Sequence, residues 1–378
     1  MPIKISIEKL AYGGEGIGHL GGKVCFIEGA LPDETVSIII TEDKKKFIRG
    51  RVKEIIVPSA NRIKAPCEYF GICGGCQYQH LEYAEEKKWK TLQAREYLSR
   101  ALKISPETIR DLVSTNSPYH YRNSITVHSQ NKQIGFISED NENLTPVTHC
   151  EIGAKGLAPI FGWDIVETSA CYRMDHQGEI FSTSQNEFFD IKIGKELILC
   201  HSRAFFQNNL AVTQLVAKQI KDWLEEHNPK TFIDIFSGVG TFTLLCAKNI
   251  PKRVCIEGSP WAIQALRKNA ERTNLDIEIH QSAAERMFKK WHTGKNLSDA
   301  IIMLDPPRTG LEMELAQTLS HASPKGLFYL SCHLGSLTRD LEIILKGGHL
   351  QIQEIIPFDM FPRTKHIELL CRLVPRVH

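Results

Sequence analysis

Two residues with the chemistry of a catalytic site follow two apolar runs in the C-terminal half of the chain. The run Ile301–Leu304 stops at Asp305, and the run Leu327–Leu330 stops before Cys332. An amphipathic segment separates the two runs, a pattern typical of neighbouring strands in a parallel sheet. Ligands bind beyond the carboxyl ends of such strands. We therefore expect Asp305 and Cys332 to lie side by side in one pocket.

Two reactions are compatible with these residues. In amine methyltransferases, an Asp-Pro-Pro motif such as Asp305-Pro306-Pro307 accepts hydrogen bonds from an exocyclic amino group, and Cys332 is then incidental. A thiolate can instead add to C6 of uracil and turn C5, a poor nucleophile, into an enolate-like carbon that attacks a sulfonium methyl group. This second reaction needs a base for the C5 proton. Glu368, at the start of the expected last strand, can point back at the pocket or lie on a surface edge.

The methyl donor needs its own site, and Thr231–Ala247 has a suitable pattern. Strand Phe232–Phe236 is followed by Gly238 and by a helix, so the backbone can approach a ligand closely where the helix begins. The next strand ends in Glu257, where doubly wound folds place an acidic residue for ribose hydroxyls. The third glycine of the dinucleotide fingerprint is missing, which favours S-adenosylmethionine over a nicotinamide cofactor.

Alternating strands and helices continue to the C-terminus. This pattern predicts an α/β catalytic unit with a Rossmann-like sheet of the methyltransferase type and an antiparallel final hairpin. Just before it, Ala204–Asn209 combines two phenylalanines with amides such as Gln207, which could stack on and hydrogen-bond a flat heterocycle.

A cluster of cysteines lies in the first third of the chain. Cys67, Cys73 and Cys76 are spaced C-x5-C-x2-C, with two glycines that allow a tight turn, and Cys150 is the natural fourth ligand. Four thiolates hold either zinc or an iron–sulfur cluster, and the spacing leaves both open.

The remaining segments complete a multidomain chain. Short strands with glycine turns predict a small barrel over residues 1–60, and a cluster of lysines and arginines indicates either a solvated hairpin or a nucleic-acid-binding face. Residues 61–203 are expected to form an irregular β domain with the cysteine site, and residues 204–378 the catalytic domain. Glu82–Leu102 predicts an amphipathic helix that buries Trp89, Leu92 and Leu98 and exposes its lysine and glutamate pairs.

Composition sets broad limits. The chain has 378 residues, of which 42% are hydrophobic and 24% charged, as in soluble globular proteins. Apolar runs are too short for a membrane span and no export signal is evident, so we expect a cytoplasmic protein with no membrane partner. Eleven cysteines in a reducing compartment favour metal binding or catalysis over disulfides where they cluster. Nothing requires a dimer, and a monomer is expected.

Four segments in order, IDIFSGVGTFTL, LDPPRTG, SCHLGSLTRD and DMFPRTKHIE, resemble the RNA (uracil-5-)-methyltransferase family. The segment GGEGIGHLGGKVCFIEGALPDETV is similar to a TRAM domain, an RNA-binding barrel. The resemblance covers nearly the whole chain. It looks most like the 23S rRNA branch, which carries both TRAM and a [4Fe–4S] cluster, whereas the tRNA branch usually lacks both.

The resemblance implies S-adenosylmethionine-dependent methylation of uracil C5 in RNA, with 23S rRNA as substrate. It implies Cys332 as nucleophile and Glu368 as the base for C5. The residues that it places around the cofactor and uracil are Gln207, Phe236, Gly238, Thr241, Glu257 and Asp305. The residues that it assigns to the [4Fe–4S] cluster are Cys67, Cys73, Cys76 and Cys150.

Two departures from the family pattern, and several rival functions, stand beside this interpretation. The nucleophile loop commonly runs Ser-Cys-Asn-Pro, and here His333-Leu334 follows the cysteine; Ser237 and Thr241 also differ from common residues of the glycine loop. A uridine stacked in folded RNA cannot present C6 to a thiol, so the target must lie in a loop or be flipped out. This requirement gives the barrel a role in holding flanking RNA. The alternative functions are methylation of a tRNA T-loop uridine, of an amine, or of cytosine C5. A further alternative is an RNA-binding iron–sulfur protein whose methyltransferase domain has decayed.

Overall fold

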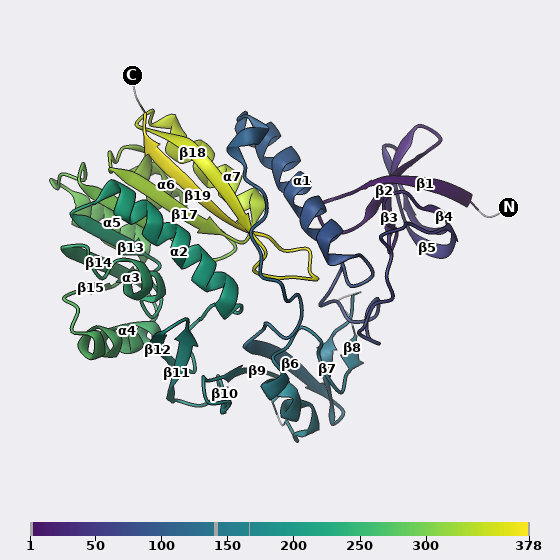
Figure 1. The fold of residues 1–378 in the computed structure, drawn as a ribbon, viewed down its shortest axis with the longest axis horizontal. Helices are drawn as coiled ribbons and strands as arrows, with labels where there is room; N and C mark the ends of the chain where they lie inside the picture. The colour runs from purple at the N-terminus through teal and green to yellow at the C-terminus, as the bar shows by residue number, and fades with distance from the viewer. Residues whose placement is uncertain (1–2, 140–142, 166, 377–378) are drawn as a thin grey trace.

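A small β-barrel, a central β region and a larger α/β unit follow one another along the chain (Figure 1). The computed structural model describes residues 3–139, 143–165 and 167–376. The barrel and the α/β unit lie at opposite ends of the longest axis, and the central region lies between them to one side (Figure 1). In these described ranges, no helix is long and apolar enough to cross a membrane.

The N-terminal barrel is built from five short strands with alternating apolar residues. They are β1 (Ile3–Leu10), β2 (Gly16–Leu20), β3 (Lys23–Glu28), β4 (Thr35–Asp43) and β5 (Phe47–Val57). The strands close in the order β1-β2-β3-β5-β4 around an interior that includes Ile5 and Ile27. Gly18 is required in β2, because a Cβ there would lie 2.4 Å from the carbonyl oxygen of Ser6. The prediction of a small closed barrel is confirmed.

The central region contains an antiparallel sheet and a separate hairpin. The sheet has the order β10-β9-β6-β7-β8 and consists of β6 (Ser124–Gln130), β7 (Gln133–Ile137), β8 (Leu144–Pro146), β9 (Ser169–Met174) and β10 (Ile180–Ser182). A 3-10 segment, η2 (Lys155–Gly162), precedes β9. The hairpin of β11 (Phe188–Ile193) and β12 (Glu196–His201) packs instead into a core with Leu244 and Ala262 of the α/β unit.

The α/β unit contains a seven-stranded sheet of order β15-β14-β13-β16-β17-β19-β18. Its strands are β13 (Thr231–Ile235), β14 (Lys252–Glu257), β15 (Glu278–Gln281), β16 (Ala300–Leu304), β17 (Gly326–Ser331), β18 (Leu350–Phe358) and β19 (Glu368–Pro375). The first five are parallel, and β19 runs antiparallel between β17 and β18. The predicted Rossmann-like sheet with an antiparallel final hairpin is confirmed.

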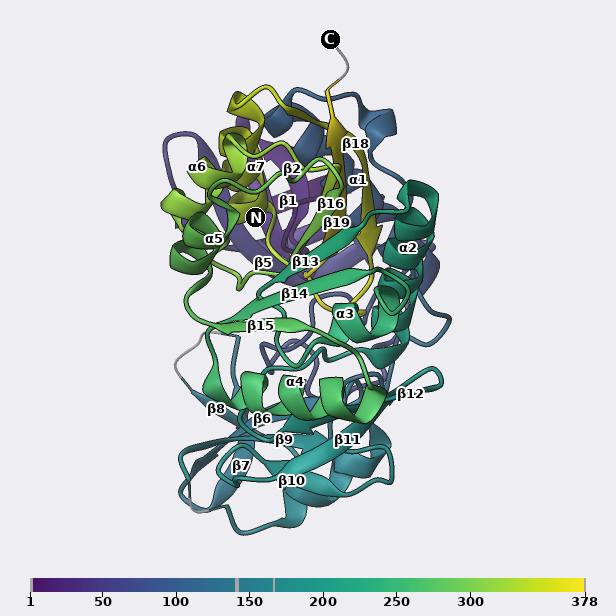
Figure 2. The ribbon, with the colours of Figure 1, turned by 90° about the vertical axis from the view of Figure 1, so that its left-hand side faces the viewer.

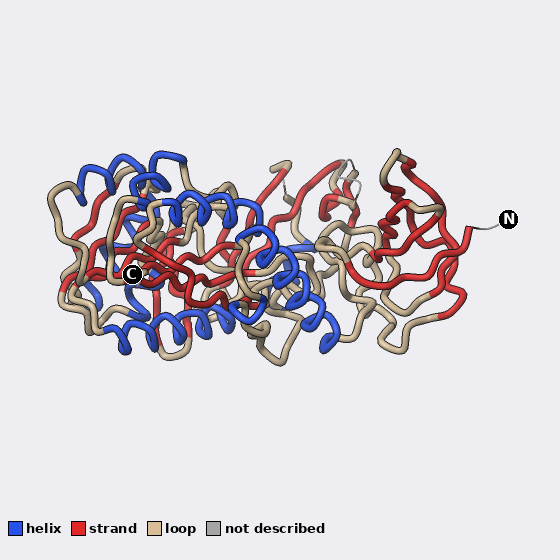
Figure 3. Tube along the Cα trace, turned by 90° about the horizontal axis from the view of Figure 1, so that it is seen from above, coloured by secondary structure: helices blue, strands red, loops and turns tan. Residues whose placement is uncertain are grey.

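Helices cover both faces of this sheet, as the view from above shows (Figure 3). One core joins a sheet face to α1 (Tyr83–Leu102), α5 (Ala284–His292), α6 (Met313–Ser320) and α7 (Leu334–Lys346). The helices packed on the opposite face are α2 (Leu210–His227), α3 (Thr241–Cys246) and α4 (Pro260–Thr273). Figure 2 looks onto α4 and the central region below the sheet.

Helix α1 is the element whose burial differs most from the sequence expectation. Leu98 is buried in the core of the sheet, as predicted, but Leu92 is 42% exposed. The residues that the helix buries most completely include Glu86 and Lys90, both 0% exposed. The prediction of a solvated charged face was therefore wrong for these two residues, because they meet opposite charges from a distant loop. The chain after α1 passes η1 (Pro106–Thr108) and bridges to the β18 edge at Ile109.

Candidate active site

The β17–β19 pairing brings a thiol and a carboxyl group together at one edge of the sheet. Ser331, the last residue of β17, pairs with Leu369 in this antiparallel ladder, so Cys332 and Glu368 are the next residues at the end of the ladder. Glu368 contributes to the raised pKa of Cys332. Glu368 also pairs with Phe358 of β18 on its other side. Strand β19 therefore has a neighbouring strand on each side, and Glu368 is only 4% exposed. The alternative of an exposed edge-strand residue was wrong.

Asp305 reaches the same edge at the end of β16. Its Oδ2 accepts a hydrogen bond of 2.9 Å from Nε2 of Gln207, which is buried just before α2. Burial raises the pKa of Asp305 to about 8, Asp234 adds to this effect, and the Gln207 amide opposes it. The carboxyl group therefore exchanges protons near neutral pH and can both donate and accept hydrogen bonds to a flat ring.

The glycine loop after β13 has the geometry of a cofactor site. Phe236 has a φ of 65°, a left-handed conformation rarely adopted by an aromatic residue, and such strain is typical of ligand sites. The Glu257 carboxylate accepts hydrogen bonds from the Gly238 N–H at 2.9 Å and the Ser259 N–H at 2.7 Å. Thr241 begins helix α3. The loop and the end of β14 are thus held together beside Asp305.

Both proposed reactive groups are in an environment that favours their neutral forms. Burial raises the pKa of Glu368 well above its usual range, with Asp305 adding to the shift and Arg308 opposing it. Burial likewise raises the pKa of Cys332 to about 11, and the carboxyl groups of Glu368 and Asp305 add to it. The guanidinium of Arg308 beside the thiol acts in the opposite direction. Each group must therefore lose its proton before it can act as a nucleophile or as a base.

Four residues near this edge were not singled out from the sequence. Arg308 directly follows the Asp-Pro-Pro motif, and this position could have identified it as a candidate site residue. Asp234 lies within β13, accepts a hydrogen bond of 2.6 Å from Thr243, and has a pKa raised by burial to about 7. Burial lowers the pKa of His366 to about 4. Tyr12, in the barrel, has a pKa raised by burial and by Cys332, and no local pattern indicates that contact.

His333, one departure from the family pattern, has a structural role that explains it. Its Nδ1 accepts a hydrogen bond of 3.1 Å from the Ser336 N–H and so caps the N-terminus of α7. An asparagine at this position can make the same bond with its side-chain oxygen. Leu334, the next residue, is buried. The capped helix leaves Cys332 at the end of β17, directly before the first turn of α7.

The four cysteines of the predicted metal site line one cavity. Cys67, Cys73, Cys76 and Cys150 surround a space of about 250 Å³, together with aromatic residues and Arg122. Burial raises the pKa of each thiol, that of Cys76 to about 12. Within the described ranges, no three His, Cys, Asp or Glu side chains come close enough to hold a metal ion. The structure brings the cysteines to one cavity but does not by itself support a metal centre.

The reactivity of the Cys332 thiol should follow the charges beside it. Because its pKa is about 11, only a small thiolate fraction reacts at pH 8, and this fraction rises as the pH rises. We expect Arg308→Met to slow alkylation of Cys332 by iodoacetamide by roughly two- to tenfold, because it removes the positive charge that favours the thiolate. Mass spectrometry of the peptide that contains Cys332 measures the rate. Arg267→Met on α4 is the control, and equal rates in all variants would contradict the charge assignment.

The fold and this site define a class of protein: a Rossmann-like, S-adenosylmethionine-dependent methyltransferase that carries an added β-barrel. Residues 191–374 match the family model described as tRNA (Uracil-5-)-methyltransferase, and residues 3–53 match that of the TRAM domain. Over the α/β unit the chain is therefore similar to the RNA (uracil-5-)-methyltransferase family, and its N-terminal barrel is similar to TRAM domains.

Relatives and solved structures agree with this assignment. The chain is 28% identical to the 23S rRNA (uracil(1939)-C(5))-methyltransferase RlmD of Shewanella halifaxensis, over 97% of this chain and 94% of that protein. It is 26% identical to an uncharacterized RNA methyltransferase of Thermotoga maritima, over 98% of both. The Pyrococcus abyssi tRNA (uracil-54, C5)-methyltransferase, solved with S-adenosyl-L-homocysteine, has the same fold. Its TM-score is 0.75 at 22% identity, covering 98% of this chain and 100% of that one.

Proposed function

We propose that the protein methylates C5 of a uridine in 23S rRNA with S-adenosylmethionine, using Cys332 as nucleophile and Glu368 as base. The observation that carries this proposal is the β17–β19 register, which brings Cys332, directly after β17, to the end of the ladder where the buried Glu368 begins β19. The reaction needs a nucleophile and a base on one uracil ring, and the donor beside both. The glycine loop after β13 lies at the same edge of the sheet and supplies the donor site.

The proposed chemistry balances with these groups, S-adenosylmethionine and solvent. Glu368 starts as a carboxylate and the Cys332 thiol releases its proton to solvent. The thiolate then forms a bond to C6 while the electrons of the C5–C6 double bond move toward O4. C5 then attacks the methyl group, and S-adenosylhomocysteine leaves. Glu368 takes the C5 proton, the C6–S bond breaks, and the double bond of 5-methyluridine is restored. The net release is one proton. Arg308 beside the sulfur favours the thiolate in the first step.

The neighbouring side chains suit the other needs of this reaction. Gln207 and Asp305 are hydrogen-bonded to each other at the pocket and present donors and acceptors for the polar edge of uracil. Phe205, two residues before Gln207, is 66% exposed and can stack on a nucleobase. Tyr12 of the barrel is close enough to Cys332 for that thiol to contribute to its raised pKa. RNA held by the barrel would therefore lie near the proposed site, where base flipping is required.

The 23S rRNA assignment rests on two features that go together in this chain, the TRAM barrel and the four-cysteine cavity. The relative in Shewanella halifaxensis is named for 23S rRNA, which agrees with it. A tRNA T-loop uridine is the second candidate, because the Pyrococcus abyssi enzyme named for tRNA shares the fold. We propose that the protein acts as a monomer on either substrate.

We also propose that Cys67, Cys73, Cys76 and Cys150 bind a [4Fe–4S] cluster. A single zinc ion draws four sulfurs to about 2.3 Å from one centre, whereas four irons spread the same thiolates around a larger group. The support is a cavity of about 250 Å³ lined by all four cysteines. When bound, the cluster crosslinks the central region and takes no part in methyl transfer. Iron and sulfide analysis of protein purified without oxygen tests it; zinc alone would contradict it.

The deciding experiment maps 5-methyluridine by mass spectrometry in total RNA from cells with and without the gene. The expected result is loss of 5-methyluridine from large-subunit rRNA. Loss from the tRNA T-loop instead would keep the reaction and replace the substrate. Unchanged 5-methyluridine together with a missing methylated amine would favour the amine methyltransferase, which uses Asp305 and does not need Cys332.

A further inference from the structure

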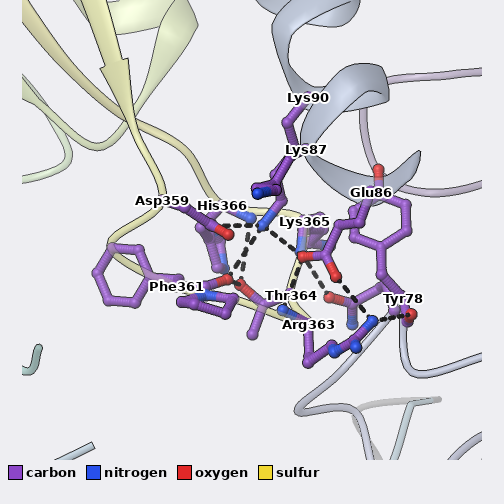
Figure 4. Close-up of polar contacts among 12 residues, drawn as sticks. Tyr78, Glu86, Lys87, Lys90, Asp359, Phe361, Arg363, Thr364, Lys365 and His366 are labelled. Carbon is purple, nitrogen blue, oxygen red and sulfur yellow. Dashed lines mark hydrogen bonds and ion pairs between the residues drawn. The ribbon is translucent and has the colours of Figure 1, made fainter. Parts of the chain in front are cut away.

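A cluster of four charged residues is buried between helix α1 and the loop that leads into Glu368. Its members are Glu86 and Lys90 from α1, and Asp359 and Arg363 from the β18–β19 loop, as Figure 4 shows. Nζ of Lys90 lies 2.9 Å from Glu86 and 2.8 Å from Asp359, and Arg363 lies 3.2 Å from Glu86. All four are at most 3% exposed. We call this set the buried charge cluster.

The cluster also holds the main chain of the loop. Lys90 donates to the Phe361 carbonyl oxygen at 3.2 Å, and the Arg363 N–H donates to Glu86 at 2.7 Å. The Arg363 carbonyl oxygen in turn accepts from the N–H groups of Gln77 and Tyr78 at 2.9 and 3.0 Å. The loop is therefore fixed to the N-terminal half of the protein by side chains and by backbone (Figure 4).

Stability alone is a poor reason for such a cluster. Removing four charges from water carries a large desolvation cost, and well-packed apolar residues often stabilise a fold equally well or better. What opposite charges add is one defined geometry, because each donor must find its acceptor. Arg363 is held at a φ of 67°, a left-handed conformation that a side chain adopts at some cost. The loop conformation is thus imposed by the cluster and does not arise from local preference.

The position of the loop connects the cluster to catalysis. The loop begins after Phe358 and ends at Glu368, and these two residues pair with each other across β18 and β19. Asp359 of the cluster is therefore attached directly to the strand residue beside Glu368. A shift of the loop would move the carboxyl group relative to the C5 proton while leaving Cys332, on β17, in place.

We propose that the buried charge cluster positions Glu368 for removal of the C5 proton, with Lys90 as its central positioning residue. The inference rests on the proposed function, in which Glu368 is the base. It adds that residues of α1, more than 260 positions earlier in the chain, control the last step of the reaction.

The test separates that last step from the earlier ones. In RNA with 5-fluorouridine at the target, C5 carries fluorine in place of hydrogen. Thiolate addition and methyl transfer proceed, but no proton can be removed and the covalent adduct persists. For Lys90→Met we expect turnover on uridine RNA to fall about 10- to 100-fold, as for a misplaced catalytic group. The rate of adduct formation with 5-fluorouridine RNA should stay within about twofold of the parent.

The matched control is Lys88→Met, two residues away on α1, where Lys88 is exposed and pairs with Glu85. It should leave both rates unchanged, and Lys90→Arg, which keeps the cation, should recover turnover. Asp359→Asn keeps the side-chain volume and serves if Lys90→Met does not fold; the same split is expected. If turnover and adduct formation fall together with Tm, or if Lys90→Met behaves like Lys88→Met, the positioning role is wrong.

The assumption that Glu368 is the base is checked in the same assay. Glu368→Gln should form the 5-fluorouridine adduct and fail to turn over uridine RNA. If Glu368→Gln turns over uridine at the parent rate, the assignment of the base fails, and that result is distinct from a failure of the cluster alone.

Discussion

Replacing Cys332 with alanine is expected to abolish methyl transfer to uridine RNA, by on the order of 10⁴-fold or more. Without the thiol no bond forms at C6, and C5 remains too weak a nucleophile to attack the donor. Transfer of tritiated methyl from S-adenosylmethionine into RNA measures the loss. The fold should be retained, because Cys332 is only partly buried and a smaller side chain leaves the end of β17 intact.

Cys171→Ala is the matched control, since Cys171 is also partly buried and lies on β9 of the central region. It should keep full activity. Binding of S-adenosylmethionine to Cys332→Ala, measured by calorimetry, should be unchanged, because the proposed donor site is built from the β13 loop and Glu257. Substantial activity of Cys332→Ala on RNA would rule out the thiolate mechanism and would favour the interpretation that the protein is an amine methyltransferase.

Glu368→Gln is expected to stop the reaction one step later. The amide cannot accept the C5 proton, so methylated uracil should remain bonded to Cys332, and kcat should fall on the order of 10² to 10⁴-fold. A protein–RNA species that survives denaturing electrophoresis would reveal it. Its mass should equal enzyme plus RNA plus one methyl group, which distinguishes this intermediate from simple addition.

Glu342→Gln, on the exposed side of α7, is the control for loss of a negative charge and should neither trap RNA nor slow turnover. Rapid turnover of Glu368→Gln without a trapped species would assign the C5 proton to another acceptor. Asp305 would then be the next residue to test, because its pKa of about 8 also suits a base near neutral pH.

The two predictions distinguish the two residues by where the reaction stops. Cys332→Ala should form no adduct with uridine or 5-fluorouridine RNA, whereas Glu368→Gln should form one with both. Variants of the buried charge cluster should show the same kind of defect as Glu368→Gln, with a smaller loss of turnover. This ordering follows from the register that brings Cys332 and Glu368 to the end of one ladder and from the attachment of the loop to α1.

Most of the catalytic unit could be predicted from the sequence because its signals are local. Of the five parallel strands, β13, β14, β16 and β17 contain short apolar runs, and the polar residue at the end of each must lie at the ligand-binding edge. Asp305, Cys332, Glu257 and the glycine loop were found in this way, and the structure places them along one edge of the sheet. The closed barrel was predicted for a similar reason, since short alternating strands with glycine turns and no helix leave few other arrangements.

The environment of Glu368 could not be read from its neighbours. A strand at the end of a chain can lie at an edge or be inserted into a sheet, and both have the same apolar pattern. The insertion of β19 between β17 and β18 decided the matter and buried the carboxyl group. Tyr12 was missed because a tyrosine in a barrel loop has no local signal of what it will lie near. Arg308 could have been found from its place after the Asp-Pro-Pro motif, but its effect on Cys332 and Glu368 depends on the tertiary structure.

The sequence by itself therefore showed the resemblance to the family, the barrel and the α/β unit with their periodic patterns, and the residues at strand ends. The tertiary structure alone decided which charges are buried. Glu86 and Lys90 have the spacing of an exposed helical ion pair, and only the arrival of Asp359 and Arg363 makes their burial possible. The physical reason is that local sequence fixes backbone geometry over a few residues, whereas desolvation of a charge depends on partners far away along the chain.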